Sequence, residues 1–407
     1  MTPAAPTRTR RRLRASLLFP ALTLAFLFGA CGSQDLPALM AGTPPPSVRI
    51  RIGMPRARAR LAVTKQAWTV RSLSGSSFAL RGGASMETDL TASASGIAVR
   101  GRSTGAQILA VEPDDTFTLD GRTYDGRLLV HLVSGQLVLV NELDMETYIA
   151  GVIGNEVGPG AEPATYRAQA VAARTYAWMR MQEQTKAQVR FHLYDSAASQ
   201  VYKGRSVPKQ YGIRYGDMVR HTAATRGVIV THDGRPFRTY YASTCGGHTT
   251  EPATSGLDAG KAHEPLRGVA CSHCSTSKYF TWTKRLTNAE LIAGLKRRKR
   301  PVKAPIREVK ITKRGRGGWV AEGAIRHGPK GEVRVLPGHE MRSALGLRSN
   351  RIESIQPIAG GWVIKGRGWG HGVGMCQWGA IEMGKKGASE TEILRYYYPG
   401  IAFTKVY

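Results

Sequence analysis

Acidic residues are scarce in this chain. Its 407 residues include 29 Asp and Glu against 58 Lys and Arg, which gives a formal net charge of +29. A basic excess of this size favours polyanionic partners, such as nucleic acid, an anionic membrane or an anionic cell wall. The sequence also lacks an RNA-binding aromatic motif, a zinc-finger repeat and a helix-turn-helix pattern. We therefore expect no nucleic-acid partner, since charge alone does not identify one.

Long apolar runs are scarce as well. The only long one, residues 15–30, follows the basic stretch TRTRRRLR and ends just before Cys31. It is too short for a comfortable membrane span, and this order of charge and apolar residues is typical of a signal peptide. The residues before Cys31 resemble a bacterial lipobox, although Phe28 stands where an aliphatic residue is usual.

These features predict a signal peptide over residues 1–30 and lipid modification of Cys31. Ordinary signal-peptide cleavage is the alternative. In either case we expect an extracytoplasmic protein of the cell envelope, held at the membrane by a lipid anchor if Cys31 is modified.

Cysteine is rare, and its placement allows two interpretations. Besides Cys31 the chain has Cys245, Cys271, Cys274 and Cys376. Cys245 with His248, and Cys271 with Cys274, form CxxH and CxxC pairs that are typical of tetrahedral zinc, with His263 and His273 nearby as further donors. Disulfides are the alternative, because an exported protein meets an oxidising environment. No cofactor is required by either interpretation, and structural zinc stays open.

Short strand patterns separated by turn residues predict a mixed α+β fold. Residues 31–47, with three consecutive prolines, are expected to form a tether. Residues 48–145 predict a β-rich N-terminal subdomain, because residues 48–52 alternate and short apolar runs recur at 108–111, 128–133 and 137–140. Residues 146–407 should hold a central helix and further strands at 227–231, 237–244, 309–311, 333–336 and 362–365. The basic segment 295–307 predicts a solvated helix face and loop, or a contact with anionic wall polymer.

The central stretch, GVIGNEVGPGAEPATYRAQAVAARTYAWMRM, covers residues 151–181. Its glycines predict a turn-rich lead around Glu156. A strong helix should begin at Pro163, since proline suits the first helical position. Arg167 and Arg174 lie seven residues apart and share a face of that helix. We expect Arg174 to form an internal ion pair.

This stretch resembles the signature of the SpoIID/LytB family, and two later stretches agree with it. They are DSAASQVYKG at residues 195–204 and the glycine-rich GRGWGHGVGMCQWGA at residues 366–380. The resemblance implies a lytic transglycosylase that acts on peptidoglycan glycan strands, with Glu156 at the catalytic position. Some members bind zinc through a His–Cys pair in the second block, but Ala198 and Ser199 stand near that position here, so that site does not carry over.

The implied reaction needs only one carboxyl group. Ordinary glycosidases use two. In a lytic transglycosylase the muramoyl 6-hydroxyl attacks intramolecularly, so one Glu can protonate the leaving oxygen and then accept the hydroxyl proton. Burial or neighbouring groups would have to raise the pKa of Glu156 for this role.

Several residues of the later motifs are candidates for sugar binding. Alternating glycines in the third block would free one side of a strand for a flat sugar or another backbone. The alternative for these residues is a structural role in turns and packing. The predicted substrate-binding residues are Asp195, Gln200, Tyr202, Trp369, His371 and Gln377.

The family resemblance also carries a second functional class. Some relatives are described as enhancers of a partner N-acetylmuramoyl-L-alanine amidase, which bind the wall without cleaving sugar. A third class is a structural wall-anchoring lipoprotein. Expected partners are therefore peptidoglycan glycan strands and, in the second class, a cell-wall amidase. The sequence leaves open whether the glycan must first lose its stem peptides.

Overall fold

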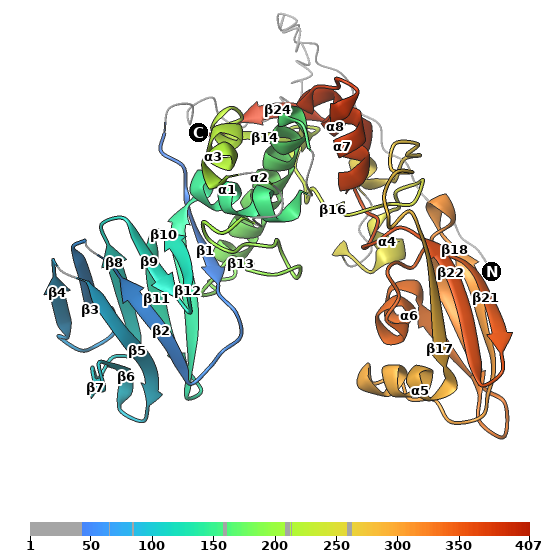
Figure 1. The fold of residues 1–407 in the computed structure, drawn as a ribbon, viewed down its shortest axis with the longest axis horizontal. Coiled ribbons are helices and arrows are strands. Elements are labelled where there is room, and N and C mark those ends of the chain that lie inside the picture. Colours follow the sequence, from blue (N-terminus) through green and yellow to red (C-terminus); the bar gives the residue numbers. More distant parts are fainter. Residues whose placement is uncertain are drawn as a thin grey trace, which may run out of the picture.

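The protein forms an arch of two lobes joined by a helical centre (Figure 1). The computed structural model describes residues 43–64, 66–83, 85–157, 161–207, 212, 214–258 and 263–407. The predicted signal peptide, Cys31 and most of the tether lie outside these residues. The predicted mixed α+β fold is confirmed by helices and several separate sheets. Within the described residues, no helix combines the length and apolar character needed to cross a bilayer.

The N-terminal lobe is a sandwich of two sheets. The sheet orders are β13-β1-β12-β11-β8-β3-β4 and β10-β9-β2-β5-β6-β7. Apolar side chains from both sheets form one continuous core, because alternate residues of each strand point inward. The strands are β1 Ser47–Arg51, β2 Arg58–Val63, β3 Trp68–Ser72, β4 Ala79–Gly82, β5 Met86–Ser93, β6 Gly96–Val99, β7 Arg102–Ser103, β8 Ile108–Pro113, β9 Thr116–Leu119, β10 Arg122–Asp125, β11 Arg127–Val133, β12 Gln136–Asp144 and β13 Leu193–Tyr194.

The helical centre follows directly from β12. Asp144 caps α1, accepting a hydrogen bond from the Thr147 N–H at 3.0 Å. The predicted start of the second helix at Pro163 is confirmed. The elements of the centre are α1 Met145–Glu156, α2 Pro163–Lys186, α3 Tyr215–Ala223, β14 Val228–His232, β15 Arg235–Pro236, β16 Tyr241–Ala242, β23 Met375–Cys376, α7 Gln377–Lys385, α8 Glu390–Tyr397 and β24 Ala402–Lys405, with the short turns α4 Pro252–Ser255 and η4 Glu264–Leu266.

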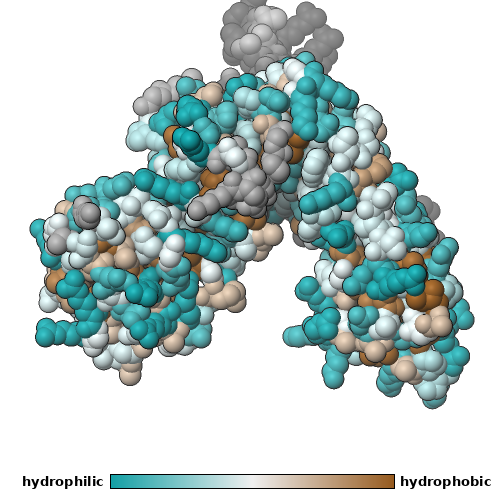
Figure 2. Space-filling view, in the orientation of Figure 1, coloured by the Kyte–Doolittle hydropathy of each residue, from teal (hydrophilic) through white to brown (hydrophobic). Residues whose placement is uncertain are grey.

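The C-terminal lobe is inserted between β16 and β23. It has its own apolar core and consists of two three-stranded sheets, β17-β22-β21 and β18-β19-β20. In the same view, Figure 2 shows an open space between this lobe and the N-terminal one, below the helical centre. The elements are β17 Thr281–Thr287, α5 Asn288–Arg297, β18 Ile306–Arg314, η5 Arg316–Gly318, β19 Val320–His327, β20 Glu332–Pro337, α6 Gly338–Leu345, β21 Ile352–Ile358 and β22 Gly361–Arg367.

Two local predictions from glycine are wrong. The turn-rich lead around Gly151 and Gly154 is instead the second half of α1. The third block does not continue as a strand, because β22 ends at Arg367. Gly368, Gly370, Gly372 and Gly374 all have positive φ, so they build a loop that side-chain-bearing residues would strain. The predicted strand 237–244 is also shorter, with only Tyr241–Ala242 paired as β16.

The glycines of α1 permit close packing, which leads to a stability prediction. A Cβ atom at Gly151 would lie 2.6 Å from the Tyr202 ring and 2.9 Å from the Gly204 carbonyl oxygen. We expect Gly151→Ala to lower the free energy of unfolding by about 1–3 kcal/mol through overpacking. Urea denaturation followed by tryptophan fluorescence measures the change.

Gly216 supplies the control for this substitution. It lies in α3, and a Cβ atom there would meet nothing within 4 Å. Gly216→Ala is expected to leave stability unchanged or to raise it by up to about 1 kcal/mol, because alanine favours helix. Equal effects at both positions would contradict the packing explanation.

Candidate functional site

Glu156 is the last residue of α1, and its carboxylate contacts the segment that follows β13. Its Oε1 accepts a hydrogen bond from the Val201 N–H at 2.6 Å. The side chain is only partly exposed. Burial raises the pKa of Glu156 above its usual value, while the Val201 N–H and the Gln377 amide act in the opposite direction. The site therefore favours a protonated carboxyl group, as a general acid requires.

Gln377 positions the helix end that carries Glu156. It is the first residue of α7, and its Nε2 donates to the Glu156 backbone carbonyl at 3.0 Å. That carbonyl lies in the last turn of α1 and has no partner within the helix. The same amide lies 3.4 Å from Gln169 Oε1. Because Gln377 is buried, the structure gives it a positioning role and leaves little surface for the predicted sugar contact.

The second block lies inside the protein, which corrects two predictions. Gln200 is fully buried. Its Oε1 accepts from the Tyr148 hydroxyl at 2.9 Å, and its Nε2 donates to the Tyr241 hydroxyl at 3.0 Å and to a backbone carbonyl of α2. Tyr202 is buried too, with its hydroxyl donating to Asn141 Oδ1 at 2.8 Å. Neither side chain is available to a sugar, because each is enclosed and hydrogen-bonded within the protein.

The Asp195 side chain binds and orients the backbone at Gly53. Its Oδ2 accepts a hydrogen bond from the Gly53 N–H at 3.0 Å. This bond fastens the segment after β13 to the N-terminal lobe, next to the parallel pairing of β1 with β13. The contact matches the orienting alternative for Asp195.

His371 is held within the protein in a neutral form. Its Nδ1 accepts from the Val373 N–H at 3.1 Å, and its ring meets the Tyr240 ring edge-on at 5.8 Å between centroids. Burial lowers the pKa of His371 to about 4. The imidazole is therefore neutral at neutral pH, and these contacts indicate a structural role in the glycine loop.

Trp369 is the predicted sugar-binding residue with the most open surface, at 38% exposed. Its ring packs edge-on against Tyr279, with centroids 4.1 Å apart. The Arg348 guanidinium lies 5.0 Å from the centroid of each of these rings. Sequence reasoning missed Tyr279 and Arg348, which lie between the second and third family motifs. A partly exposed aromatic pair beside a cation suits contact with a sugar ring.

Two tyrosines near Glu156 were also missed. Tyr148 is fully buried and Tyr241 is partly buried, and Gln200 lies between their hydroxyls. Burial raises the pKa of both phenols well above the usual value, and the charge of Glu156 adds to the effect. Both phenols therefore remain protonated, with the Tyr148 hydroxyl donating to Gln200 and the Tyr241 hydroxyl accepting from it. Tyr148 precedes the motif and Tyr241 lies 85 positions after Glu156, so only the fold brings them together.

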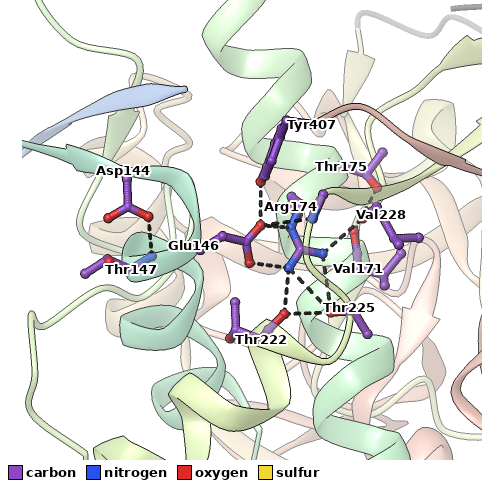
Figure 3. A network of polar contacts seen from close by, with 11 residues as sticks. Asp144, Glu146, Thr147, Val171, Arg174, Thr175, Thr222, Thr225, Val228 and Tyr407 are labelled. Atoms are coloured by element: carbon purple, nitrogen blue, oxygen red, sulfur yellow. Dashed lines mark hydrogen bonds and ion pairs between the residues drawn. The ribbon is translucent and has the colours of Figure 1, made fainter. Parts of the chain in front are cut away.

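A buried ion pair holds this part of the helical centre together (Figure 3). The predicted internal pairing of Arg174 is confirmed: its Nε and Nη2 donate to the two carboxylate oxygens of Glu146 at 2.8 and 2.7 Å. Arg174 also donates to the Val228 carbonyl at 3.0 Å. The Tyr407 hydroxyl donates to Glu146. The network thus joins α1, α2, β14 and the C-terminal residue.

The structure brings four cysteines together and leaves out the predicted histidine. The Sγ atoms of Cys245, Cys271, Cys274 and Cys376 all lie within 4.8 Å of one another, and all four side chains are buried. His248 instead places its Nδ1 2.6 Å from the Thr249 carbonyl oxygen. Cys376 therefore replaces His248 in the predicted group, because β23 runs beside β16 and brings its end to Cys245.

The first two sequence motifs and the inserted lobe each match a known protein family. Residues 133–232 match SpoIID, stage II sporulation protein. Residues 264–374, which contain the C-terminal lobe, match a domain of unknown function (DUF8618).

Comparison with curated proteins gives longer matches. The chain is 30% identical over 299 residues to an uncharacterized protein of Brachyspira hyodysenteriae, covering 72% of this chain and 75% of the relative. It is 30% identical over 271 residues to stage II sporulation protein D of Bacillus amyloliquefaciens, covering 64% and 74%. A shorter match, 34% over 71 residues, covers 17% of this chain and 10% of the amidase enhancer of Bacillus subtilis. The chain belongs to the stage II sporulation protein D family.

Proposed function

We propose that this protein is a peptidoglycan lytic transglycosylase that cleaves the bond between N-acetylmuramic acid and N-acetylglucosamine through Glu156. The observation that carries the proposal is the burial of the Glu156 carboxyl group, which raises its pKa at the position where α1 ends. Membership of the stage II sporulation protein D family supports a cell-wall-related role. Such a role places the protein outside the cytoplasm, and lipid anchoring through Cys31 is part of the proposal.

The proposed reaction needs no water and no second carboxylate. Protonated Glu156 donates its proton to the glycosidic oxygen as the bond from that oxygen to the muramoyl anomeric carbon breaks. The muramoyl 6-hydroxyl oxygen then bonds to the same carbon, and Glu156, now a carboxylate, accepts the hydroxyl proton. The products are a 1,6-anhydromuramoyl end and a free N-acetylglucosamine 4-hydroxyl, and Glu156 returns to its starting state.

The direct test is the chemical nature of the new glycan ends. Purified protein is incubated with intact and with peptide-stripped peptidoglycan, and the products are analysed by mass spectrometry. Anhydromuramoyl ends are expected, and comparison of the two substrates shows whether stem peptides must be removed first. Reducing ends would mean hydrolysis and would overturn the mechanism. Absence of cleavage on both substrates would overturn the enzyme proposal.

A second candidate function is enhancement of a cell-wall amidase. The partial match to the amidase enhancer of Bacillus subtilis favours it. This function predicts that the protein raises the rate at which an N-acetylmuramoyl-L-alanine amidase releases stem peptides, and that Glu156→Gln raises it equally. Measuring peptide release with each form separates the two candidates.

The raised pKa of Glu156 predicts a pH profile for cleavage. The free enzyme must begin with a protonated carboxyl group, so kcat/KM should fall as pH rises through the pKa of Glu156 in the folded protein. That pKa lies above the usual Glu value of about 4.3, and cleavage should therefore persist above that pH. Initial rates on soluble peptide-stripped glycan across pH 4–9 give the profile. Glycan binding measured at each pH separates ionisation of Glu156 from changes in binding, and a profile that only rises with pH would contradict the assignment.

A further inference from the structure

The four buried cysteines form a compact group with the dimensions of a mononuclear metal site. Their sulfur atoms lie within 4.8 Å of one another. The Sγ atoms of Cys245 and Cys274 are 3.6 Å apart. A disulfide would need about 2.05 Å. A tetrahedral zinc ion, with bonds of about 2.3 Å to each sulfur, places the sulfurs about 3.8 Å apart. The observed separation therefore fits four thiolates around one ion.

We propose that Cys245, Cys271, Cys274 and Cys376 bind one structural zinc ion. All four ligand positions are filled by protein sulfur, as in closed structural sites that leave no room for a reacting water. Four soft thiolates in a tetrahedral arrangement select zinc or iron among the common metals. A cluster of several irons is disfavoured, because its cysteines bind different irons and their sulfurs lie farther apart.

The surroundings of the sulfurs suit thiolates. The Cys245 N–H donates to Cys376 Sγ at 3.2 Å. The Tyr397 hydroxyl lies 3.2 Å from Cys271 Sγ, close enough to donate to it. Four thiolates around a divalent ion carry two excess negative charges. The Arg351 guanidinium donates to the Cys245 carbonyl at 3.2 Å, so its positive charge lies beside the group and offsets part of that excess.

The site also explains how the C-terminal lobe is fixed to the helical centre. Cys245 follows β16, while Cys271 and Cys274 precede β17, the first strand of the lobe. Cys376 follows the last strand of the lobe, β22, and ends β23. One ion bound by all four residues would tie together the chain segments that enter and leave the lobe.

The zinc site also supports the proposed active site. Cys376 is the N-terminal cap residue of α7, and the next residue is Gln377, which donates to the Glu156 carbonyl. Zinc thus fixes the start of α7 and, through Gln377, the end of α1. The metal proposal does not depend on glycan cleavage, because its test measures the metal directly.

The test is the metal content of the purified protein together with the oxidation state of its cysteines. Inductively coupled plasma mass spectrometry is expected to find about one zinc per chain. In Cys376→Ser the content should fall to roughly a tenth or less of that value, because three thiolates bind more weakly. Replacement of zinc by Co²⁺ in the wild type should give the visible and thiolate-to-cobalt absorption bands of a tetrahedral site, which tests the ligand set without a substitution.

Two variants serve as controls. His248→Ala and Cys31→Ser should both keep about one zinc per chain, since neither residue belongs to the group. Loss of zinc in His248→Ala would overturn the assignment of four cysteine ligands. Intact mass measurement without reductant decides between zinc and disulfides: a metal-free wild type with these cysteines paired would overturn the proposal, and so would one iron per chain in place of zinc.

Discussion

Replacing Glu156 by glutamine is expected to slow the formation of anhydromuramoyl ends by about 10²- to 10⁴-fold, the usual contribution of a general acid–base group. The amide cannot donate an acidic proton to the glycosidic oxygen, and it cannot accept one from the 6-hydroxyl. Glutamine has nearly the same size and can still accept the hydrogen bond from Val201. The loss should therefore appear in kcat, with glycan binding preserved. The rate of anhydromuramoyl product formation, quantified by mass spectrometry on peptide-stripped glycan, measures the effect.

Although it should abolish most activity, Glu156→Gln is not expected to lower the stability of the protein. Burial raises the pKa of Glu156 in the folded protein, so folding favours the protonated form. The stabilisation from protonated Glu156 is fully present below the pKa of Glu156 in the unfolded state. It is lost as pH rises through the pKa of Glu156 in the folded state. Above the pKa of the unfolded state the partly buried carboxyl group thus costs stability, and Glu156→Gln should melt at the same temperature as wild type or higher. Inactivity with a lowered melting temperature would indicate a damaged fold and would count against the assignment.

Glu162 offers a matched control for the loss of one carboxylate. It is exposed, precedes α2 as its N-cap residue and makes no side-chain cap bond. Glu162→Gln removes the same charge six positions away and should retain wild-type cleavage. Equal loss of activity in both variants would point to the overall charge and would contradict a specific role for Glu156.

The sequence predicted the mixed fold, but it placed Glu156 in a turn-rich lead and not at the end of α1, and it did not predict the environment of that residue. The motif around Glu156 consists of residues that are neighbours in the chain, so the sequence alone identifies it. The hydrogen-bond partners of Glu156 are Val201 and Gln377, which lie 45 and 221 positions away. Similarly, the cysteine group takes Cys376, 131 positions from Cys245, in place of His248, which is three positions away. Spacing along the chain cannot supply partners that only strand pairing brings together.

The structural predictions drawn from glycine were wrong for a related reason. Glycine favours turns when it is judged locally, yet the Gly151 position needs glycine because Tyr202 packs against α1 there. In the second block, Gln200 and Tyr202 have side chains that suit sugars as well as they suit buried hydrogen bonds. Burial decides between those uses, and burial is set by the sandwich and α2. The ion pair of Arg174 was predictable because a long charged side chain on a small-residue helix face needs a partner when it is buried.

Replacing Arg174 by methionine is expected to destabilise the protein by about 3–5 kcal/mol, because it leaves Glu146 without its cation in a mostly buried site. Arg174 is completely enclosed and donates to groups on α1, α3 and β14 (Figure 3). The change in the free energy of unfolding, measured by urea denaturation, tests the prediction. Adding Glu146→Gln should recover part of the loss, since the glutamine removes the uncompensated charge and still accepts from Tyr407.

Arg167 on the same helix separates the effect of burial from that of pairing itself. It forms an ion pair with Glu390 at 3.1 Å, but both side chains are about 30% exposed, at 31% and 28%. Water solvates both charges after either is removed, so Arg167→Met should cost only about 0–1 kcal/mol. A similar loss in the free energy of unfolding for the two variants would show that the helix, and not the enclosed network at Glu146, determines the destabilisation. A cost at Arg174 several times larger would establish that this network holds α1, and with it Glu156, against α2.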